Sequence, residues 1–561
     1  FLSIVEWWYD HRLDVETGIL RGYGDDTQLT GETFWMYFCT GDEKIRHLLR
    51  AVTDGTWKNA GFYRGYPMRT NDVGHNAEEV VGAWPLLVLS EYGDPRYVEM
   101  SMESVSVLDF ATTQTPLGHR HFKSWYFSAT EAVTDGDLGI DNMGNSAFTI
   151  LGHMLSWYNR DPKLTSFYRE WADSWLDDFA RSREQGFTKP ISVRIPAEEY
   201  VEGVYHRSYT MPHQFFITGL LSGDSTYTAR ALSNEDGFYP ALRRRGSSML
   251  LRDFASQRHR LLEDARFAAF RERPTTAFET WFVTGDSAPL ADYYRKKVED
   301  YKQGTHYLYT QGQPSTDRLW GLWDENLFLA YLGGYAAGHR RTSNWPGLAI
   351  SYTEAGTDLA SLVLENRTTQ LALRAYNFEP AREQVEIRVW QLEPGEYRLE
   401  NGADANEDGV FDGETEIRSI AVRRGTRMTV PIPYGQMQLL RLRQVEARPE
   451  PALLPDLAIG PDDVSYRQQE EGGVVHVTVH NIGSRRAGES TLRLLDRRDN
   501  AIAQTDLPAL DAPVNLRPSV VSLRVPLSYE DWQRVHRVAV TPHRSALEIT
   551  QENNQLRIGH E

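Results

Sequence analysis

Hydrophobic residues recur at helical spacing through the first 340 residues of the chain, in pairs of segments separated by a short polar break. One segment carries Trp171, Trp175 and Phe179 on a single face, which is the pattern of a helix with one buried side. Each break ends in an Asp, and these recur at intervals of 52 to 67 residues: Asp42, Asp94, Asp161, Asp224 and Asp286. Because Gly suits a helix end and Asp caps a helix start, the pattern predicts repeated helical hairpins.

Six such hairpins, the sixth at 322–338, predict a closed toroid of inner and outer helices, of the (α/α)6 type, over residues 1–345. An open helical solenoid without catalysis would show a similar periodicity. The connection 112–141 is about 30 residues long, and loops of that length commonly carry function. We therefore expect residues 1–345 to form a catalytic helical domain.

The hydrophobic period changes after Trp345 from that of a helix to that of a strand. Leu359–Leu364, Leu371–Phe378 and Val385–Trp390 alternate or run apolar between turn residues, which predicts a β-sandwich over 346–447. A Pro-rich segment at 448–455 marks the next boundary, and a second β-sandwich is expected at 454–561. The expected fold class is therefore multidomain α + β, with a helical toroid followed by two β-sandwich domains.

An acidic loop inside the first predicted sandwich has the spacing of a calcium site. Its candidate ligands are the side chains of Asp404, Asn406, Asp408 and Asp412 and the carbonyl of Val410, with Gly409 at the sharp turn. Position 12 of the motif is Thr415 and not Glu, so an acidic turn without metal is the alternative. We expect structural calcium here and no organic cofactor.

The loops that enter the first helix of each hairpin should share the end of the domain opposite the Gly-Asp breaks. They are rich in His, Asp, Asn, Arg and aromatic residues, as sugar-binding clefts are. The candidates are Asp25, Arg69, Asp72, His75, Asn76, His119, Arg120, His121, Lys123, Tyr126, Asp141, Asn145, Tyr205, His206, Arg207, Tyr209, Trp320 and Trp323. The alternative roles are structural: Asp25, Asp72 and Asp141 as helix caps, the segment from His119 to Lys123 as a solvated charged loop, and Trp320 and Trp323 as core residues.

Composition argues against several classes of partner and site. The 561 residues carry 60 Lys and Arg against 78 Asp and Glu, a net charge of −18, which argues against a general nucleic-acid binder. No apolar run is long enough to span a membrane. The single cysteine, Cys39, excludes a disulfide framework and a Cys-based zinc site.

The layout of residues 1–445 resembles carbohydrate-active toroid enzymes, namely toroid polysaccharide lyases and unsaturated glucuronyl hydrolases. Two phrases resemble the glucuronyl hydrolases: Asp72-Val-Gly, and Ile140-Asp141 followed by Asn145. That resemblance implies a glycoside hydrolase acting through Asp72 and Asp141. A non-catalytic, surface glycan-binding protein is a further alternative.

Lyase chemistry depends on other residues of the same loops. β-Elimination at a uronic acid needs a group that neutralises the carboxylate, a base for the C5 proton and an acid for the leaving oxygen. Tyr126, Tyr205, Tyr209, His121 and His206 are the candidates for proton transfer. The segment from His119 to Lys123 offers four cations to a polyanion, with His119, His121 and Lys123 on one side if it is extended. We expect a lyase that cleaves a uronic-acid-containing acidic polysaccharide.

The C-terminal 105 or so residues resemble the CARDB-type bacterial adhesion module. The resemblance lies in Pro455-Asp-Leu at its start, Asn481-Ile-Gly483 after a strand, and Glu552-Asn553-Asn554 before the last strand. It implies an immunoglobulin-like sandwich that contacts a cell surface or matrix, on a secreted or surface-bound bacterial protein. Because the chain starts at Phe1, we expect a targeting segment upstream of it.

Overall fold

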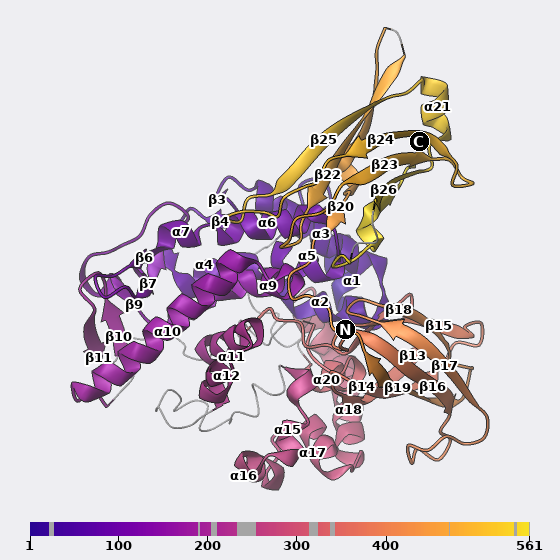
Figure 1. Cartoon of the computed structure of the whole chain (residues 1–561). Coiled ribbons are helices and arrows are strands. Elements are labelled where there is room, and N and C mark those ends of the chain that lie inside the picture. The colour runs from indigo at the N-terminus through magenta and orange to yellow at the C-terminus, as the bar shows by residue number, and fades with distance from the viewer. Residues whose placement is uncertain are drawn as a thin grey trace.

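The computed structural model describes residues 1–21, 27–188, 191–202, 210–232, 254–312, 324–336, 343–470, 472–543 and 547–559. Within these ranges helices dominate the N-terminal part, and every strand longer than four residues lies beyond residue 350 (Figure 1). The expected order of a helical part followed by β-sheets is confirmed. The closed ring of six hairpins stays a prediction.

The N-terminal part is built mainly from helices joined by short turns. Its α-helices are α1 (Leu2–Arg12), α2 (Gln28–Thr40), α3 (Glu43–Lys58), α4 (Val73–Val81), α5 (Trp84–Ser90), α6 (Pro95–Val105), α7 (Leu108–Ala111), α8 (Ser146–Thr149), α9 (His153–Asn159), α10 (Pro162–Glu184), α11 (Thr210–Ser222), α12 (Ser225–Leu232), α15 (Arg260–Glu263), α16 (Ala268–Glu272), α17 (Ala277–Thr284), α18 (Ala288–Asp300), α19 (His306–Tyr309) and α20 (Glu325–Tyr331). The pairs α2–α3, α5–α6, α11–α12 and α17–α18 pack against each other, as hairpins do.

Three of the breaks form the helix caps that the sequence predicts, whereas at the fifth Ser287, and not Asp286, takes the N-cap position of α18. Gly41 ends α2 in the left-handed conformation with φ 69°, and Asp42 accepts hydrogen bonds from the N–H groups of Lys44 and Ile45 at 2.8 and 3.2 Å. Asp94 caps α6 and Asp161 caps α10 in the same way. Each cap satisfies N–H groups that the first turn of a helix leaves without partners.

Short strands collect at the other end of these helices, which we call the strand-lined end. They are β5 (Asn71–Asp72), β6 (Thr112–Gln114), β7 (Arg120–Phe122), β8 (Tyr126–Phe127), β9 (Ile140–Asp141), β10 (Ile191–Arg194) and β11 (Glu199–Glu202). β5 pairs with β8, β6 with β7, and β10 with both β9 and β11. Two further ribbons pair β1 (Leu13–Asp14) with β2 (Ile19–Leu20) and β3 (Phe62–Tyr63) with β4 (Tyr66–Pro67).

Helix α10 joins the two ends of the helical part. Its 23 residues correspond to about 35 Å. It begins after Asp161, close to the C-terminal module, and Asp178 near its far end reaches His121 on β7. Aromatic residues line the buried face of α10, and the side chains of Trp171 and Trp175 have no exposed surface.

The first β-sandwich consists of two antiparallel sheets. Its strands are β12 (Ile350–Thr353), β13 (Leu359–Asn366), β14 (Gln370–Asn377), β15 (Gln384–Val389), β16 (Gly395–Ala403), β17 (Thr415–Val422), β18 (Arg427–Pro431) and β19 (Met437–Ala447). The sheet orders are β12-β15-β18 and β13-β14-β19-β16-β17. The three strands expected from the hydrophobic pattern correspond to β13, β14 and β15.

This sandwich shares its hydrophobic core with the helices. α2 packs on β12 and α20 on β13, and one continuous cluster of buried side chains extends from Ile4 to Leu442 and also takes in Ala458, Ile482, Leu516 and Ile549 of the C-terminal segment. The change at residue 345 is therefore a change of secondary structure within one core.

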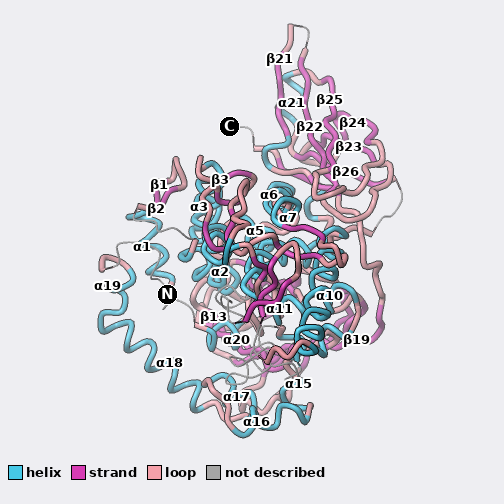
Figure 2. The backbone as a smooth tube through the Cα atoms, turned by 90° about the vertical axis from the view of Figure 1, so that its left-hand side faces the viewer, coloured by secondary structure: helices cyan, strands magenta, loops and turns pink. Residues whose placement is uncertain are grey.

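The C-terminal module has two sheets and a core of its own. Its elements are β20 (Leu457–Ala458), β21 (Val464–Gln468), β22 (Gly473–Asn481), β23 (Ser490–Leu495), β24 (Ala501–Leu507), β25 (Ser519–Pro526), α21 (Tyr529–Arg534), β26 (Arg537–Pro542) and β27 (Gln555–Arg557). β22 pairs with β20, β21 and β25, while β24, β23, β26 and β27 form the second sheet. Val477 and Leu492 belong to the core between them. The module projects from the rest of the molecule (Figure 2).

The three parts meet at a domain junction formed by Tyr158, Arg424, Asp456 and Asn553. Asp456 is fully buried and accepts hydrogen bonds from the Tyr158 hydroxyl and, at 3.2 Å, from the Asn553 amide. Arg424 of the first sandwich donates to the Tyr158 carbonyl at 2.6 Å. Burial raises the pKa of Asp456 to about 8, because hydrogen bonds from neutral donors only partly offset the loss of water.

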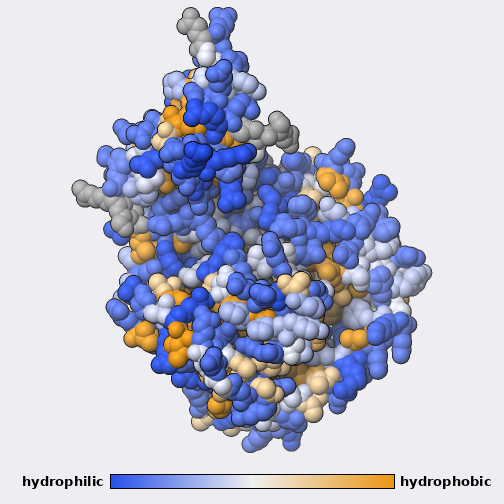
Figure 3. Space-filling model, turned by 90° about the vertical axis from the view of Figure 1, so that its right-hand side faces the viewer, coloured by the Kyte–Doolittle hydropathy of each residue, from blue (hydrophilic) through white to orange (hydrophobic). Residues whose placement is uncertain are grey.

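The face seen in Figure 3 is mostly hydrophilic, with small scattered apolar groups. No helix among the described residues combines the length and apolar character needed to cross a membrane.

We predict that the junction makes stability fall as pH rises. The folded pKa of Asp456, about 8, lies above that of an unfolded Asp, about 3.9. Its stabilising contribution is therefore complete below about pH 4 and is lost progressively as pH rises toward 8. Asp456→Asn should flatten the decline of the melting temperature between pH 5 and 8. Asp462→Asn, at an exposed position, should keep the wild-type slope; equal slopes in all three proteins would contradict the prediction.

Candidate functional site

The strand-lined end carries most of the predicted site residues that the structure describes. Asp72, His75, His121 and Asp141 lie on or directly after its short strands, at the ends of helices opposite the Gly-Asp breaks. Seven predicted residues lie outside the described ranges: Asp25, Tyr205, His206, Arg207, Tyr209, Trp320 and Trp323.

His121 is enclosed between two carboxylates. Its side chain has no exposed surface, its Nδ1 lies 2.9 Å from Asp141 Oδ2, and its Nε2 lies 3.2 Å from Asp178 Oδ2. Burial opposes protonation of His121, but the hydrogen bond to Asp141 and the charge of Asp178 outweigh it and raise its pKa to about 9. In this arrangement both ring nitrogens of His121 face carboxylates of the protein.

Asp141 is equally enclosed, and both of its oxygens are occupied. Oδ1 accepts from the Asn145 amide at 2.8 Å, and Oδ2 accepts from the Trp171 indole at 3.2 Å and from the Phe122 N–H at 3.3 Å. Asn142, and not Asp141, caps the helical turn that follows. Asp141 therefore holds β7, β9 and α10 together through hydrogen bonds, a role that neither the cap nor the catalytic interpretation anticipated.

His119 contacts three acidic side chains. Its Nε2 lies 3.3 Å from Asp177 Oδ2, and its Nδ1 lies 3.4 Å from Glu198 Oε2 and 3.7 Å from Asp178 Oδ1. His119 and His121 thus point to the same side of β7, as alternation along an extended segment predicts. The possible metal-ligand atoms of His119, His121 and Asp178 all lie within 4.8 Å of one another, so this group could hold a metal ion.

Asp178 and Glu198 were not predicted from the sequence. Asp178 lies three residues after Trp175 and seven after Trp171, on the buried face of α10. Because acidic residues are rarely buried without a partner, its position on this face could have marked it as a site candidate. Glu198 lies in the turn between β10 and β11, where no sequence pattern marks it.

The other two cations of this segment are also occupied. The Arg120 guanidinium lies 3.1 Å from Glu170, and the Lys123 ammonium donates to the Phe110 carbonyl at 2.6 Å. The protein thus supplies a partner to every cation from His119 to Lys123. The binding of a polyanion by this segment stays a prediction.

A second group, which we call the Asp72 group, consists of Asp72, His75 and Tyr126. Asp72 caps α4, accepting from the His75 N–H at 3.0 Å through Oδ1, while Oδ2 lies 2.5 Å from His75 Nδ1. The His75 side chain is 50% exposed. Asp72 pairs directly with Tyr126 across β5 and β8, which places their side chains on the same face. This group combines a carboxylate, an oriented imidazole and a phenol next to solvent.

Around the Asp72 group, some neighbouring side chains are exposed to solvent and others are buried and fix the backbone. Arg69 is 59% exposed and lies 2.7 Å from Glu79. Trp125 stacks edge to face on Tyr126 at 5.9 Å and is half-buried. Asn76 is buried and donates to the carbonyls of Arg69 and Phe127, so it fixes the backbone.

The acidic loop of the first sandwich is ordered by arginines. Its expected calcium ligands are Asp404, Asn406, Asp408, Val410 and Asp412. Asp404 lies 2.7 Å from Arg374 and accepts from the Gly409 N–H at 3.2 Å, while Arg441 donates to the Gly409 carbonyl. Among the described residues, the three Asp side chains of the loop do not converge as a metal-binding group. Calcium binding there stays a prediction.

No protein-family model matches the chain, and no curated protein is detectably similar to it in sequence. The site must therefore be interpreted from its own chemistry.

We predict that His121 stabilises the fold far more than His75. Replacing His121 by Leu leaves Asp141 and Asp178 buried without their shared partner, and breaking a buried charge pair typically costs about 3–5 kcal/mol. His75→Leu removes a half-exposed pair, for which about 1 kcal/mol or less is expected. Urea unfolding followed by tryptophan fluorescence compares the two midpoints. Similar shifts for both variants would show that the His121 cluster contributes no special stability.

Proposed function

We propose that the protein cleaves a uronic-acid-containing acidic polysaccharide by β-elimination, using the Asp72 group. The observation that carries the proposal is the geometry of this group: an imidazole oriented by a carboxylate, next to a phenol on the same face, in contact with solvent.

Each member of the group has a role in that chemistry. Asp72 accepts from Nδ1 of His75, which leaves Nε2 to take the C5 proton of the sugar. As that proton leaves, the C4=C5 double bond forms and the C4–O bond breaks. Tyr126 donates its hydroxyl proton to the departing oxygen and recovers one from solvent. Arg69, exposed beside the group, neutralises the sugar carboxylate.

The hydrolase alternative depends on Asp141, and the contacts of Asp141 favour it less. A hydrolytic acid must present an oxygen to the glycosidic bond. Both Asp141 oxygens are engaged inside the protein, and the side chain has no exposed surface. The Asp72 group has the exposure that the reaction needs.

The same proposal includes the setting of the enzyme. We take the substrate to be outside the cell and the protein to be secreted or bound to the bacterial surface, with the C-terminal module contacting a surface or matrix. The acidic net charge of −18 makes a local cation such as Arg69 important for a polyanionic substrate.

A panel of acidic polysaccharides tests the reaction class. The purified chain should create an ultraviolet-absorbing 4,5-unsaturated uronate on at least one uronate polymer. Reducing ends released without this absorbance would indicate hydrolysis, and loss of an existing unsaturated group would indicate a glucuronyl hydrolase. Binding with neither product would indicate a glycan-binding protein.

Variants of the Asp72 group test the residue assignment. His75→Gln and Tyr126→Phe should each lower kcat by at least about 100-fold, the usual contribution of a positioned proton-transfer group, with little change in substrate binding. The control His11→Gln, at an exposed histidine of α1, should keep full activity. If Asp72→Asn and Asp141→Asn are inactive while Tyr126→Phe is active, the hydrolase interpretation replaces this one.

A further inference from the structure

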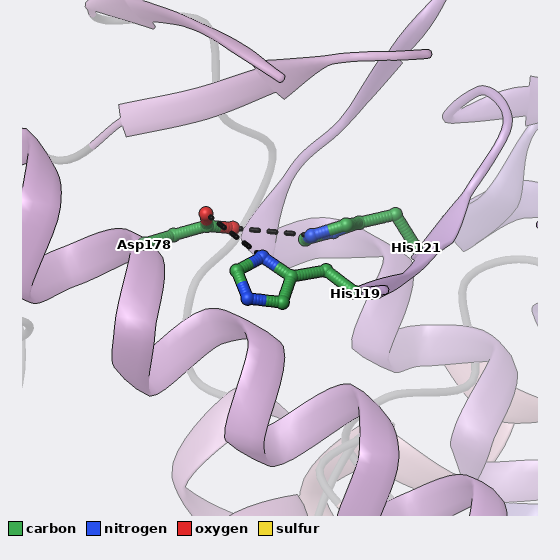
Figure 4. A group of neighbouring side chains, drawn as sticks. All are labelled: His119, His121 and Asp178. Carbon is green, nitrogen blue, oxygen red and sulfur yellow. Dashed lines mark ion pairs between the residues drawn. The ribbon is translucent and has the colours of Figure 1, made fainter. Parts of the chain in front are cut away.

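Three side chains from separate elements converge beneath the strand-lined end. His119 lies just before β7, His121 lies on β7, and Asp178 comes from α10 (Figure 4). His121 and Asp178 have no exposed surface, and the His119 side chain is 18% exposed. The group is therefore mostly buried, and only the His119 side chain is partly exposed to solvent.

The atoms that face one another in this group lack hydrogen-bond partners. They are His119 Nδ1, His121 Nε2, Asp178 Oδ2 and the neighbouring Glu198 Oε2. The contact between His121 Nε2 and Asp178 Oδ2 is short, at 3.2 Å, but it lacks the alignment of a hydrogen bond. Buried polar atoms without partners are rare in folded proteins, so four that converge on one place call for a ligand.

The spacing of these atoms matches a small tetrahedral cation. An ion with bonds of about 2.0–2.1 Å holds its ligand atoms about 3.3 Å apart. The corresponding separations are 3.2 Å between His121 Nε2 and Asp178 Oδ2, and 3.4 Å between His119 Nδ1 and Glu198 Oε2. His119 Nδ1 lies 3.7 Å from Asp178 Oδ1, the other oxygen of that carboxylate, and the possible ligand atoms of His119, His121 and Asp178 all lie within 4.8 Å of one another.

In both histidines, the ring nitrogen that faces away from the proposed ion lies close to a carboxylate. The second ring nitrogen of His121 lies 2.9 Å from Asp141, and that of His119 lies 3.3 Å from Asp177. Metal-binding histidines usually have such an outer carboxylate, which fixes the ring and the tautomer.

The acidic members are supported in a similar way. Asp178 Oδ1 accepts from the Tyr200 hydroxyl at 3.1 Å, and Glu198 Oε1 accepts from the Thr115 hydroxyl. In each residue one oxygen is thereby anchored, and the other remains for an ion.

We propose that His119, His121 and Asp178 bind a divalent transition-metal ion of the zinc class, with Glu198 as the fourth ligand. Two imidazoles among the donors favour zinc over calcium or magnesium, which prefer oxygen. A dication also offsets the carboxylates gathered in a space where water does not reach Asp141 or Asp178. The site is independent of the proposed function, since none of its ligands belongs to the Asp72 group.

Metal titration of the purified full chain tests the proposal. After treatment with a strong chelator and dialysis, the chain should bind about one Zn²⁺ and raise its melting temperature. Co²⁺ in place of Zn²⁺ should give the visible absorption of a tetrahedral site with nitrogen ligands. Ca²⁺ at the same concentration should not displace either ion.

Two variants locate the ion. His119→Gln should weaken Zn²⁺ binding by at least about 100-fold. Asp177→Asn alters the outer partner of His119 and an exposed ion pair with Arg181, at a side chain 49% exposed, and should weaken binding by about 10–100-fold without disturbing folding. The matched control Asp137→Asn, at an 88% exposed Asp, should bind as the wild type does.

The proposal is overturned if the wild type binds neither Zn²⁺ nor Co²⁺, or if the Co²⁺ spectrum lacks imidazole ligands. It is also overturned if Asp177→Asn and Asp137→Asn bind Zn²⁺ equally well. If His119→Gln fails to fold, the spectrum and the Asp177→Asn affinity decide the question.

Discussion

A carboxylate that loses contact with water must be given positive charge or several donors, and this constraint organises the strand-lined end. Asp141 and Asp178 have no exposed surface, and the penalty for burying such an ion is several kcal/mol before partners are supplied. The partners come from β7, α10 and the segment after β9, so satisfying two acidic groups positions all three elements. The Asp72 group rests on this frame, because β8, which pairs with β5, follows β7 along the chain.

The domain junction meets the same constraint by a different route. Asp456 is as deeply buried as Asp141, but its partners are a phenol and an amide, which are neutral. Asp141 instead faces a histidine. The contrast explains why burial raises the pKa of Asp456 to about 8, whereas at His121 the two neighbouring carboxylates raise the pKa of the histidine itself to about 9.

Local signals in the sequence predicted the change from helices to strands, the caps at Asp42, Asp94 and Asp161, and three strands of the first sandwich. Gly41-Asp42 specifies a helix end and a helix start within two residues, and the alternation from His119 to His121 correctly predicts a shared side. The partners of these residues could not be predicted, since they depend on which distant element packs nearby. Arg120 meets Glu170 and Lys123 meets a backbone carbonyl, and nothing near either residue in the sequence indicates this. The core shared by α2 and β12 was hidden for the same reason.

The junction also fixes where the C-terminal module points. Residues of all three parts meet around Tyr158 and Asp456, so the module is joined to the other two parts by direct contacts as well as by the chain. Helix α10 leads about 35 Å from this junction to the strand-lined end, on the far side of the helical part (Figure 1). A molecule immobilised through its C-terminal module would therefore turn the Asp72 group away from its support. The separation between the support and the strand-lined end would then include the length of α10, about 35 Å.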